Sequence, residues 1–220
     1  KPADITCPED SERLGVAIIY QEFNLVPGLT VAENIFMRRQ PKKNGMIDWK
    51  RMNQMAQAII DEIDINIRPT DIVNTLTVAE QQMVEICKAV SLNSKILIMD
   101  EPTSALDPEG IREFYEMVGE LNRKEGLTVI VAEHHLEAAL PYAKKFILMN
   151  KGKIISQGTP EEVMRVMKKD HIYEEAIPDM YRAQLTLEDQ GISFEKPFLN
   201  IRDAEQSVMD SFEKGEGKHA

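Results

Sequence analysis

The sequence contains few cysteines, few aromatic residues and no long apolar run. Cys7 and Cys87 are its two cysteines, and their separation matches none of the usual spacings of a metal site. This usage favours a reducing, cytosolic compartment. No apolar run approaches the roughly eighteen residues that cross a bilayer, and no signal peptide is visible at the start. We therefore expect a chain that reaches a membrane only through a partner.

Basic residues are also in the minority. The 220 residues include 26 lysines and arginines against 37 aspartates and glutamates, which gives a net charge of -11. Because such a surface repels a polyanion, the composition speaks against nucleic-acid binding, although local groups could still hold a phosphate ligand. The first residue is Lys1 rather than Met, so we expect the sequence to begin partway through a longer one.

Apolar strand-like stretches alternate with helical patterns, which is typical of the α/β class. We expect strands over 15–20, 96–99 and 127–132, the last two buried on both faces because they lack polar alternation. Thr77 and Glu80 have capping-box spacing at the start of a helix, and another helix should end at Gly126. A hairpin is expected from "FILMN" to "IISQG". Asp48 should cap a helix whose core stripe is Met52, Met55, Ala56, Ile59, Ile60 and Ile63.

Polar side chains follow two of the expected strands, at the edge where open α/β sheets bind ligands. Asp100 suits a hard cation such as Mg²⁺, usually held through water. Glu101 can accept a proton from an attacking water or orient it. His134 can donate a hydrogen bond to a phosphate. Taken alone, such a pair is more often structural: Asp100 would only cap the next turn, and His134 would be an ordinary loop histidine.

Four stretches resemble, in order, the motifs of ATP-binding cassette (ABC) proteins. "IIYQEFNLVPGLTVAENIF" (18–36) resembles their glutamine loop, and "LTVAEQQMVEICKAV" (76–90) resembles their signature segment. "ILIMDEPTSALD" (96–107) resembles the Walker B strand and D-loop, and "VIVAEHHLEAALPYAKKFILMNKGKIISQGTPEEV" resembles the switch-histidine region and closing hairpin. The resemblance implies an α/β fold, an incomplete P-loop NTPase-like nucleotide-binding domain with parallel core strands and a helical subdomain.

The resemblance also implies a division into parts. Residues 1–23 would be a partial ATPase core with the glutamine loop, and residues 24–92 a helical subdomain with the signature segment. Residues 93–165 would form the ATPase core with Walker B, the D-loop and the switch histidine. Residues 166–220 would be a C-terminal tail.

Site roles follow from the same resemblance, with ATP and Mg²⁺ as cofactors. Gln21 and Asp100 would hold Mg²⁺, and Gln21 would also couple the site to a membrane partner. Glu101 and His134 would be catalytic, with His135 as the alternative switch histidine. Residues that would contact nucleotide are the signature segment Leu76, Thr77, Val78, Ala79 and Glu80, which acts on ATP bound to the opposite subunit, together with Gln21 and Asp107.

Most cassettes have Leu-Ser-Gly-Gly-Gln where this chain has residues 76–80. Thr77 keeps the hydroxyl and Ala79 keeps a backbone N–H group, whereas Val78 adds bulk where the phosphate should approach.

The family implies a second ATPase subunit, identical or different, and transmembrane permease subunits at the cytoplasmic face of the cell membrane. Residues 1 to about 106 resemble ATPases of monosaccharide importers, and residues from Asp107 onward resemble those of energy-coupling-factor vitamin and metal importers. Sugar is therefore the favoured solute, with vitamin or metal left open. Replacing Glu33 and Asn34, in the segment expected to contact the permease, should lower transport with little effect on the fold.

One family motif has no match in the sequence. Gly-x-x-x-x-Gly-Lys-Ser/Thr, whose N–H groups and lysine neutralise the phosphates of ATP, does not occur. We favour an importer ATPase subunit truncated before this loop, which alone should not bind MgATP and should expose a large apolar face. The alternative is a degenerate partner module that supplies its signature segment and hydrolyses nothing. A third reading, an ATPase of DNA repair or chromosome structure, conflicts with the glutamine loop and the net charge.

Overall fold

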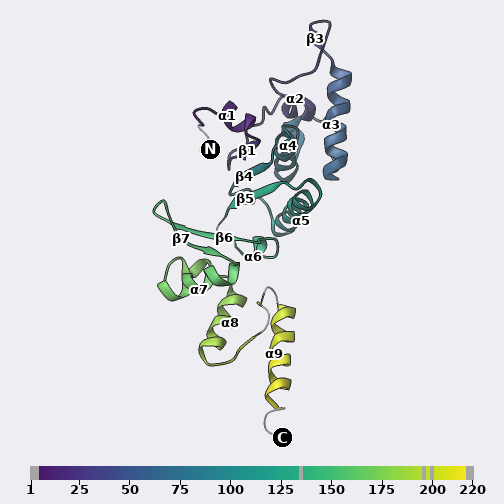
Figure 1. Ribbon diagram of the computed structural model, residues 1–220. Helices are drawn as coiled ribbons and strands as arrows, with labels where there is room; N and C mark the ends of the chain where they lie inside the picture. Colours follow the sequence, from purple (N-terminus) through teal and green to yellow (C-terminus); the bar gives the residue numbers. More distant parts are fainter. Residues whose placement is uncertain (1–4, 134–135, 195–196, 199–200, 217–220) are drawn as a thin grey trace. The chain divides into compact units, whose positions relative to one another are not determined.

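The computed structural model describes residues 5–133, 136–194, 197–198 and 201–216, drawn as ribbons in Figure 1. The chain forms two compact units, Lys1–Glu133 and His134–Ala220. His134 and His135 lie outside the described residues, and so does Lys1. The division of the sequence into the four parts 1–23, 24–92, 93–165 and 166–220 remains a prediction.

The first unit contains a three-stranded parallel sheet. It contains β1 (Val16–Ile19), β4 (Ile96–Asp100) and β5 (Thr128–Ala132) in the order β1-β4-β5. The register pairs Ile19 with Met99 and Asp100 with Ala132, so the carboxyl ends of the strands meet at one edge. The expected strands and the expected α/β class are confirmed, and the candidate site residues follow this edge.

Three helices of the first unit begin or end at the capping residues that the sequence predicts. Asp48 caps α3 (Trp49–Ile63), and Thr77 and Glu80 form a capping box at α4 (Val78–Val90). Gly126, with a φ of 64°, ends α5 (Pro108–Glu125). The remaining elements are α1 (Pro8–Arg13), α2 (Val31–Ile35), the hairpin strands β2 (Lys42–Lys43) and β3 (Met46–Ile47), and the 3-10 turn η1 (Val73–Thr75).

The core of this unit lies between α4 and the sheet and between α2, α3 and α4, which lie side by side in Figure 1. Val84 and Ile86 of α4 and Leu97 and Met99 of β4 are fully buried. This packing fixes the start of α4, and with it the segment 76–80, relative to the sheet.

Two expectations about burial are wrong. Strands β4 and β5 are not buried on both faces, since Ile98 is half-buried and Ile130 is 48% exposed. Ile18, Ile98 and Ile130 are register partners on one sheet face, which the described elements of this unit leave partly open. The expectation of a large exposed apolar face stays a prediction.

Met55 also departs from the expected core stripe of α3, because it is 39% exposed. At about 100° per residue, position 55 lies on the edge of the stripe centred on Met52, Ala56, Ile60 and Ile63. Those four residues are buried, as expected.

The two cysteines lie in opposite environments, which leads to a prediction. Cys87 is fully buried on α4, and burial raises the pKa of its thiol to about 12, whereas Cys7 is exposed. Because the thiolate is the reactive form, a folded sample should show fast alkylation at Cys7 and almost none at Cys87. Iodoacetamide labelling followed by peptide mass spectrometry checks this, with a denatured sample as the control in which both react. Fast labelling of Cys87 in the folded protein would contradict the packing of α4.

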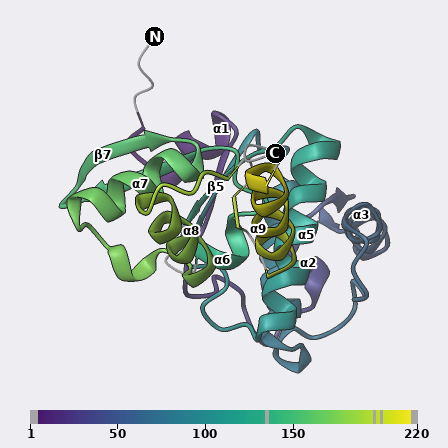
Figure 2. The same cartoon turned by 90° about the horizontal axis from the view of Figure 1, so that it is seen from below.

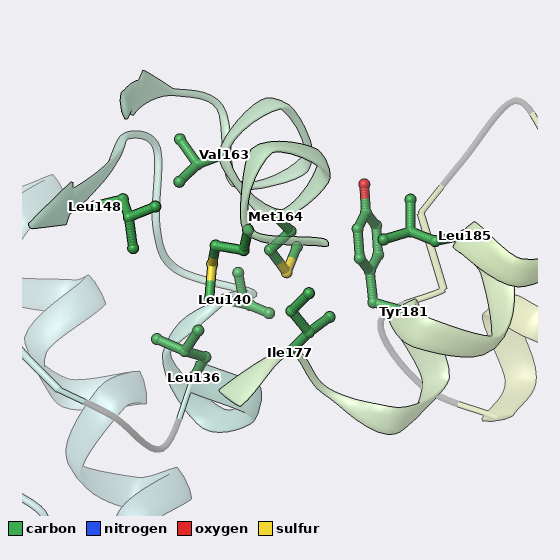
Figure 3. Packing of buried hydrophobic residues seen from close by; sticks show 9 residues of the cluster. Leu136, Leu140, Leu148, Val163, Met164, Ile177, Tyr181 and Leu185 are labelled. Carbon is green, nitrogen blue, oxygen red and sulfur yellow. The ribbon is translucent and has the colours of Figure 1, made fainter. Parts of the chain in front are cut away.

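The second unit begins with the short helix α6 (Leu136–Ala139) and contains the expected hairpin. Its strands are β6 (Phe146–Asn150) and β7 (Lys153–Gly158), and α7 (Pro160–Asp170) packs along β7 in both views (Figure 2). The 3-10 turn η2 (Glu174–Ala176), α8 (Asp179–Asp189) and α9 (Ile201–Glu216) follow. Figure 3 shows the core of this unit, formed by Leu136, Leu140, Leu148, Val163, Met164, Met167, Ile177, Tyr181 and Leu185.

None of the helices in the described ranges is both long enough and apolar enough to pass through a bilayer.

Candidate functional site

The strand ends bring the glutamine loop and the acidic pair together. The amide Nε2 of Gln21, two residues after β1, donates a hydrogen bond of 3.0 Å to Oε2 of Glu101, directly after β4. These residues are 80 positions apart in the sequence. The contact follows from the parallel pairing of β1 with β4, and it places an amide and a carboxylate at one point of the sheet edge.

Glu101 has an unusual backbone conformation. Its φ of 42° lies in the left-handed region, which costs a residue other than glycine about 1 kcal/mol or more. Its N–H group donates to the carbonyl oxygen of Ala132 at 2.9 Å, which extends the β4–β5 pairing by one bond. The chain therefore turns sharply at Glu101 and points the side chain toward Gln21.

Asp100 is the last residue of β4 and is exposed. Asp100 directly precedes Glu101 in the sequence, and the amide of Gln21 has an oxygen that its hydrogen bond to Glu101 does not use. One carboxylate and one amide oxygen suit Mg²⁺, which retains several waters and takes phosphate oxygens from its substrate. Within the described ranges, no cluster of three or more His, Cys, Asp and Glu side chains is placed to hold a metal ion.

A second contact joins the turn after β4 to the end of β5. Oγ1 of Thr103 donates a hydrogen bond of 2.7 Å to Oε2 of Glu133, and Thr103 is 2% exposed. Tyr115 of α5 is buried in the same region, and burial together with the charge of Glu133 raises the pKa of its phenol. The turn after β4 is thus hydrogen-bonded to the end of β5 through Glu101, before Pro102, and through Thr103, after it.

The segment after Gln21 is held by side chains of two helices. Glu85 of α4, which is buried, accepts a 2.6 Å hydrogen bond from the N–H of Asn24, and Lys88 Nζ donates to the carbonyl oxygen of Asn24 at 3.0 Å. Lys88 and Glu85 also form an ion pair at 3.6 Å. This clamp attaches the glutamine loop to the helix that begins at the signature segment.

Asn34 of α2 forms a matching clamp two residues further on. Its side chain, 1% exposed, accepts from the N–H of Val26 at 2.7 Å and donates to the carbonyl oxygens of Val26 and Thr30. Glu33 is the acidic member of a capping box with Thr30. These contacts argue against the expectation that replacing Glu33 and Asn34 would have little effect on the fold, because both side chains satisfy backbone groups of this loop.

Residues 76–80 form the start of α4, and their hydrogen bonds are local. The hydroxyl of Thr77 donates to Glu80 Oε2 at 2.9 Å and accepts from the N–H of Glu80 at 3.2 Å. Gln81 Nε2 donates to the carbonyl oxygen of Leu76 at 3.0 Å. Val78 is 40% exposed, so its bulk stands on the surface at the helix N-terminus. A ligand here would share the Thr77 hydroxyl with Glu80.

Asp107 caps α5, because its Oδ1 accepts a 2.8 Å hydrogen bond from the N–H of Gly110. The side chain is exposed, and its role at a nucleotide stays a prediction. His134, the other expected catalytic residue, follows Glu133 in the sequence but lies outside the described residues.

Sequence reasoning did not find Thr103, Glu133, Glu85 or Lys88 as parts of this region. The partners in the contacts Thr103–Glu133 and Asn24–Glu85 are 30 and 61 positions apart. No local pattern marks such pairs. One available signal was that Glu85 is an acidic residue on the apolar side of a helix, where a charge is rarely buried without a partner.

The parallel α/β sheet, with Gln21 and Glu101 in contact where its strands end, is typical of the class of α/β nucleotide-binding cassettes. Residues 3–104 match the model of the family described as ABC transporter. Within residues 3–104, a little under half of the chain, the sequence therefore matches an ABC transporter ATPase domain.

Similar proteins agree with the assignment. The chain is 45% identical over 163 residues to the Streptomyces coelicolor protein "Ribose import ATP-binding protein RbsA 2", covering 72% of this chain and 31% of that protein. It is 34% identical over 208 residues to "Ribose import ATP-binding protein RbsA" of Corynebacterium glutamicum, covering 91% of this chain and 39% of that protein. A crystal structure of a nucleotide-free ATP-binding cassette from an ABC transporter has a TM-score of 0.65 at 24% identity, covering 78% of this chain and 72% of that one, which shows the fold alone.

The chain spans about a third of the length of these curated relatives. Because the second match covers 91% of the chain, the likeness to sugar-import proteins extends past Asp107. The division of the sequence into halves of different ancestry stays a prediction.

Proposed function

We propose that the chain is an ATP-hydrolysing subunit of an ABC importer, with a sugar as the favoured solute. The observation that carries the proposal is the hydrogen bond between Gln21 and Glu101, which unites the glutamine loop with the residue after the Walker B strand. Further support comes from the names of the relatives, which describe ribose import.

In this proposal Glu101 accepts the proton of the water that attacks the terminal phosphate of ATP. The Gln21 amide fixes the Glu101 carboxylate and the water, and Asp100 holds Mg²⁺, which would neutralise charge on the phosphates. His134 would donate a hydrogen bond to the transferred phosphate. Residues 76–80 and Asp107 would contact ATP on a second ATPase subunit.

The phosphates also need a cationic loop, for which the sequence given has no match. In the proposal this loop is supplied by residues outside these 220. The permease subunits would contact the glutamine-loop segment that Glu85 and Asn34 hold, at the cytoplasmic face of the membrane. The alternative, a partner that hydrolyses nothing, assigns no chemistry to Glu101.

The test is ATP hydrolysis by the assembled transporter that contains this chain, purified in detergent. In such importers a separate solute-binding protein would deliver the sugar to the permease. Mg-dependent turnover that rises when this binding protein delivers a sugar supports the proposal. A complex that imports solute but whose turnover is unaffected by changes in this chain would favour the non-hydrolysing partner.

Thr77 offers a prediction that separates stability from turnover. Thr77→Ala should lower the free energy of unfolding by about 1 kcal/mol, because the helix loses its cap, and should also slow ATP hydrolysis because the phosphate loses a hydroxyl. Thr159→Ala in the second unit removes an equivalent capping box. Thermal unfolding should therefore show a similar loss in both variants, whereas turnover should fall only in Thr77→Ala. Equal turnover in the two variants would remove Thr77 from the site.

A further inference from the structure

We propose that Thr103 and Glu133 are positioning residues that hold the turn after β4 in the shape that orients Glu101. The inference rests on the proposed ATPase function, because Glu101 is the group through which both residues act. Neither residue is assigned contact with nucleotide.

The evidence is a double attachment of this turn to β5. The N–H of Glu101 donates to the carbonyl oxygen of Ala132 at 2.9 Å, and Oγ1 of Thr103 donates to the carboxylate of Glu133 at 2.7 Å. The two donors lie two residues apart on the turn, and the two acceptors are adjacent at the end of β5. Together they leave the peptide groups between them little freedom to rotate.

The left-handed backbone at Glu101 needs such an attachment. Its φ of 42° is unfavourable for a side chain with a Cβ atom, so an unattached turn would relax toward an ordinary conformation and redirect the carboxylate. Within the turn, Ser104 N donates to Glu101 O at 3.2 Å and Leu106 N donates to Thr103 O at 3.1 Å. The bond from Thr103 to Glu133 adds a carboxylate acceptor from outside the turn, and hydrogen bonds to an ionised group are stronger than neutral ones.

The Thr103 side of the Thr103–Glu133 hydrogen bond is shielded from water. Thr103 is 2% and Tyr115 is 3% exposed, so little water competes for the Thr103 hydroxyl. Removing the hydroxyl would take away the donor that joins the buried side of the turn to the half-buried Glu133 carboxylate. The expected response is a movement of the turn, and reaction rates fall steeply when a reacting group moves by a fraction of an ångström to about 1 Å.

The experiment measures ATP hydrolysis by the assembled transporter carrying variants of Thr103. Thr103→Val has nearly the same volume but no hydroxyl, and it should lower kcat by about tenfold or more with little change in KM, since substrate binding does not use this group. Thr103→Ser keeps the donor and should stay within about twofold of the wild type. Thr128→Ala, which removes an exposed hydroxyl from β5, is the matched control and should leave kcat unchanged.

Two results would overturn the inference: an unchanged kcat in Thr103→Val, or a Thr103→Ser variant as slow as Thr103→Val. An unchanged kcat together with a lower melting temperature would make the contact purely structural. A wild-type complex without ATP hydrolysis would instead refute the proposed function itself, so the two failures are distinguishable.

Discussion

Replacing Glu101 by glutamine should lower ATP turnover of the assembled transporter on the order of 100- to 10,000-fold while ATP binding is retained. The amide oxygen of a glutamine can still accept the hydrogen bond that Gln21 Nε2 donates at 3.0 Å, so the local geometry should survive. What is lost is the ability to take a proton from water. The measurement is steady-state phosphate release, together with nucleotide binding on the same preparation.

The control for this variant is Glu113→Gln, on the exposed side of α5. It removes the same charge from the same unit and should leave turnover unchanged. Turnover by Glu101→Gln at the wild-type rate would exclude Glu101 as the base. Loss of nucleotide binding in Glu101→Gln would show that the residue has a binding role instead.

Asn34→Leu should lower the free energy of unfolding of the first unit by about 1 to 3 kcal/mol. The replacement has a similar volume but removes the 2.7 Å acceptor of the Val26 N–H, which is part-buried beside the buried side chain of Asn34. The carbonyl oxygens of Val26 and Thr30 lose less, since the N–H groups of Leu29 and of Asn34 itself still donate to them. Urea unfolding followed by circular dichroism measures the change.

Gln54→Ala is the matched comparison, because it removes an exposed amide from α3 and should change stability by less than about 0.5 kcal/mol. If Asn34→Leu were as stable as this comparison, the clamp on Val26 would contribute nothing. Transport measured on Asn34→Leu alone would not test contact with the permease, because the loop itself should rearrange.

The parts of the fold that could be predicted from the sequence depend on contacts close along the chain. The cap at Asp48, the Thr77–Glu80 box and the stop at Gly126 each rest on hydrogen bonds or backbone angles within about four residues. The placement of Asp100 and Glu101 at the sheet edge followed from the strand before them and the general rule for parallel sheets.

What the sequence could not predict depends on contacts far along the chain. The Thr103–Glu133 bond requires β5 to lie beside β4, and the Glu85 clamp requires α4 to pack against the glutamine loop. The burial of strands was misjudged for a similar reason. An apolar run such as Thr128–Ala132 indicates a strand, but the elements packed on each side of the sheet decide how many faces are covered, and Ile130 is 48% exposed.

The most direct test of the account is sugar uptake and ATP hydrolysis measured in the same proteoliposomes, with the wild-type complex and with Glu101→Gln. Labelled ribose is offered with the binding protein on one side and MgATP on the side that carries this chain. The account predicts that the wild type accumulates a sugar only with MgATP, and that Glu101→Gln abolishes accumulation and hydrolysis together. Accumulation by Glu101→Gln at the wild-type rate would contradict it.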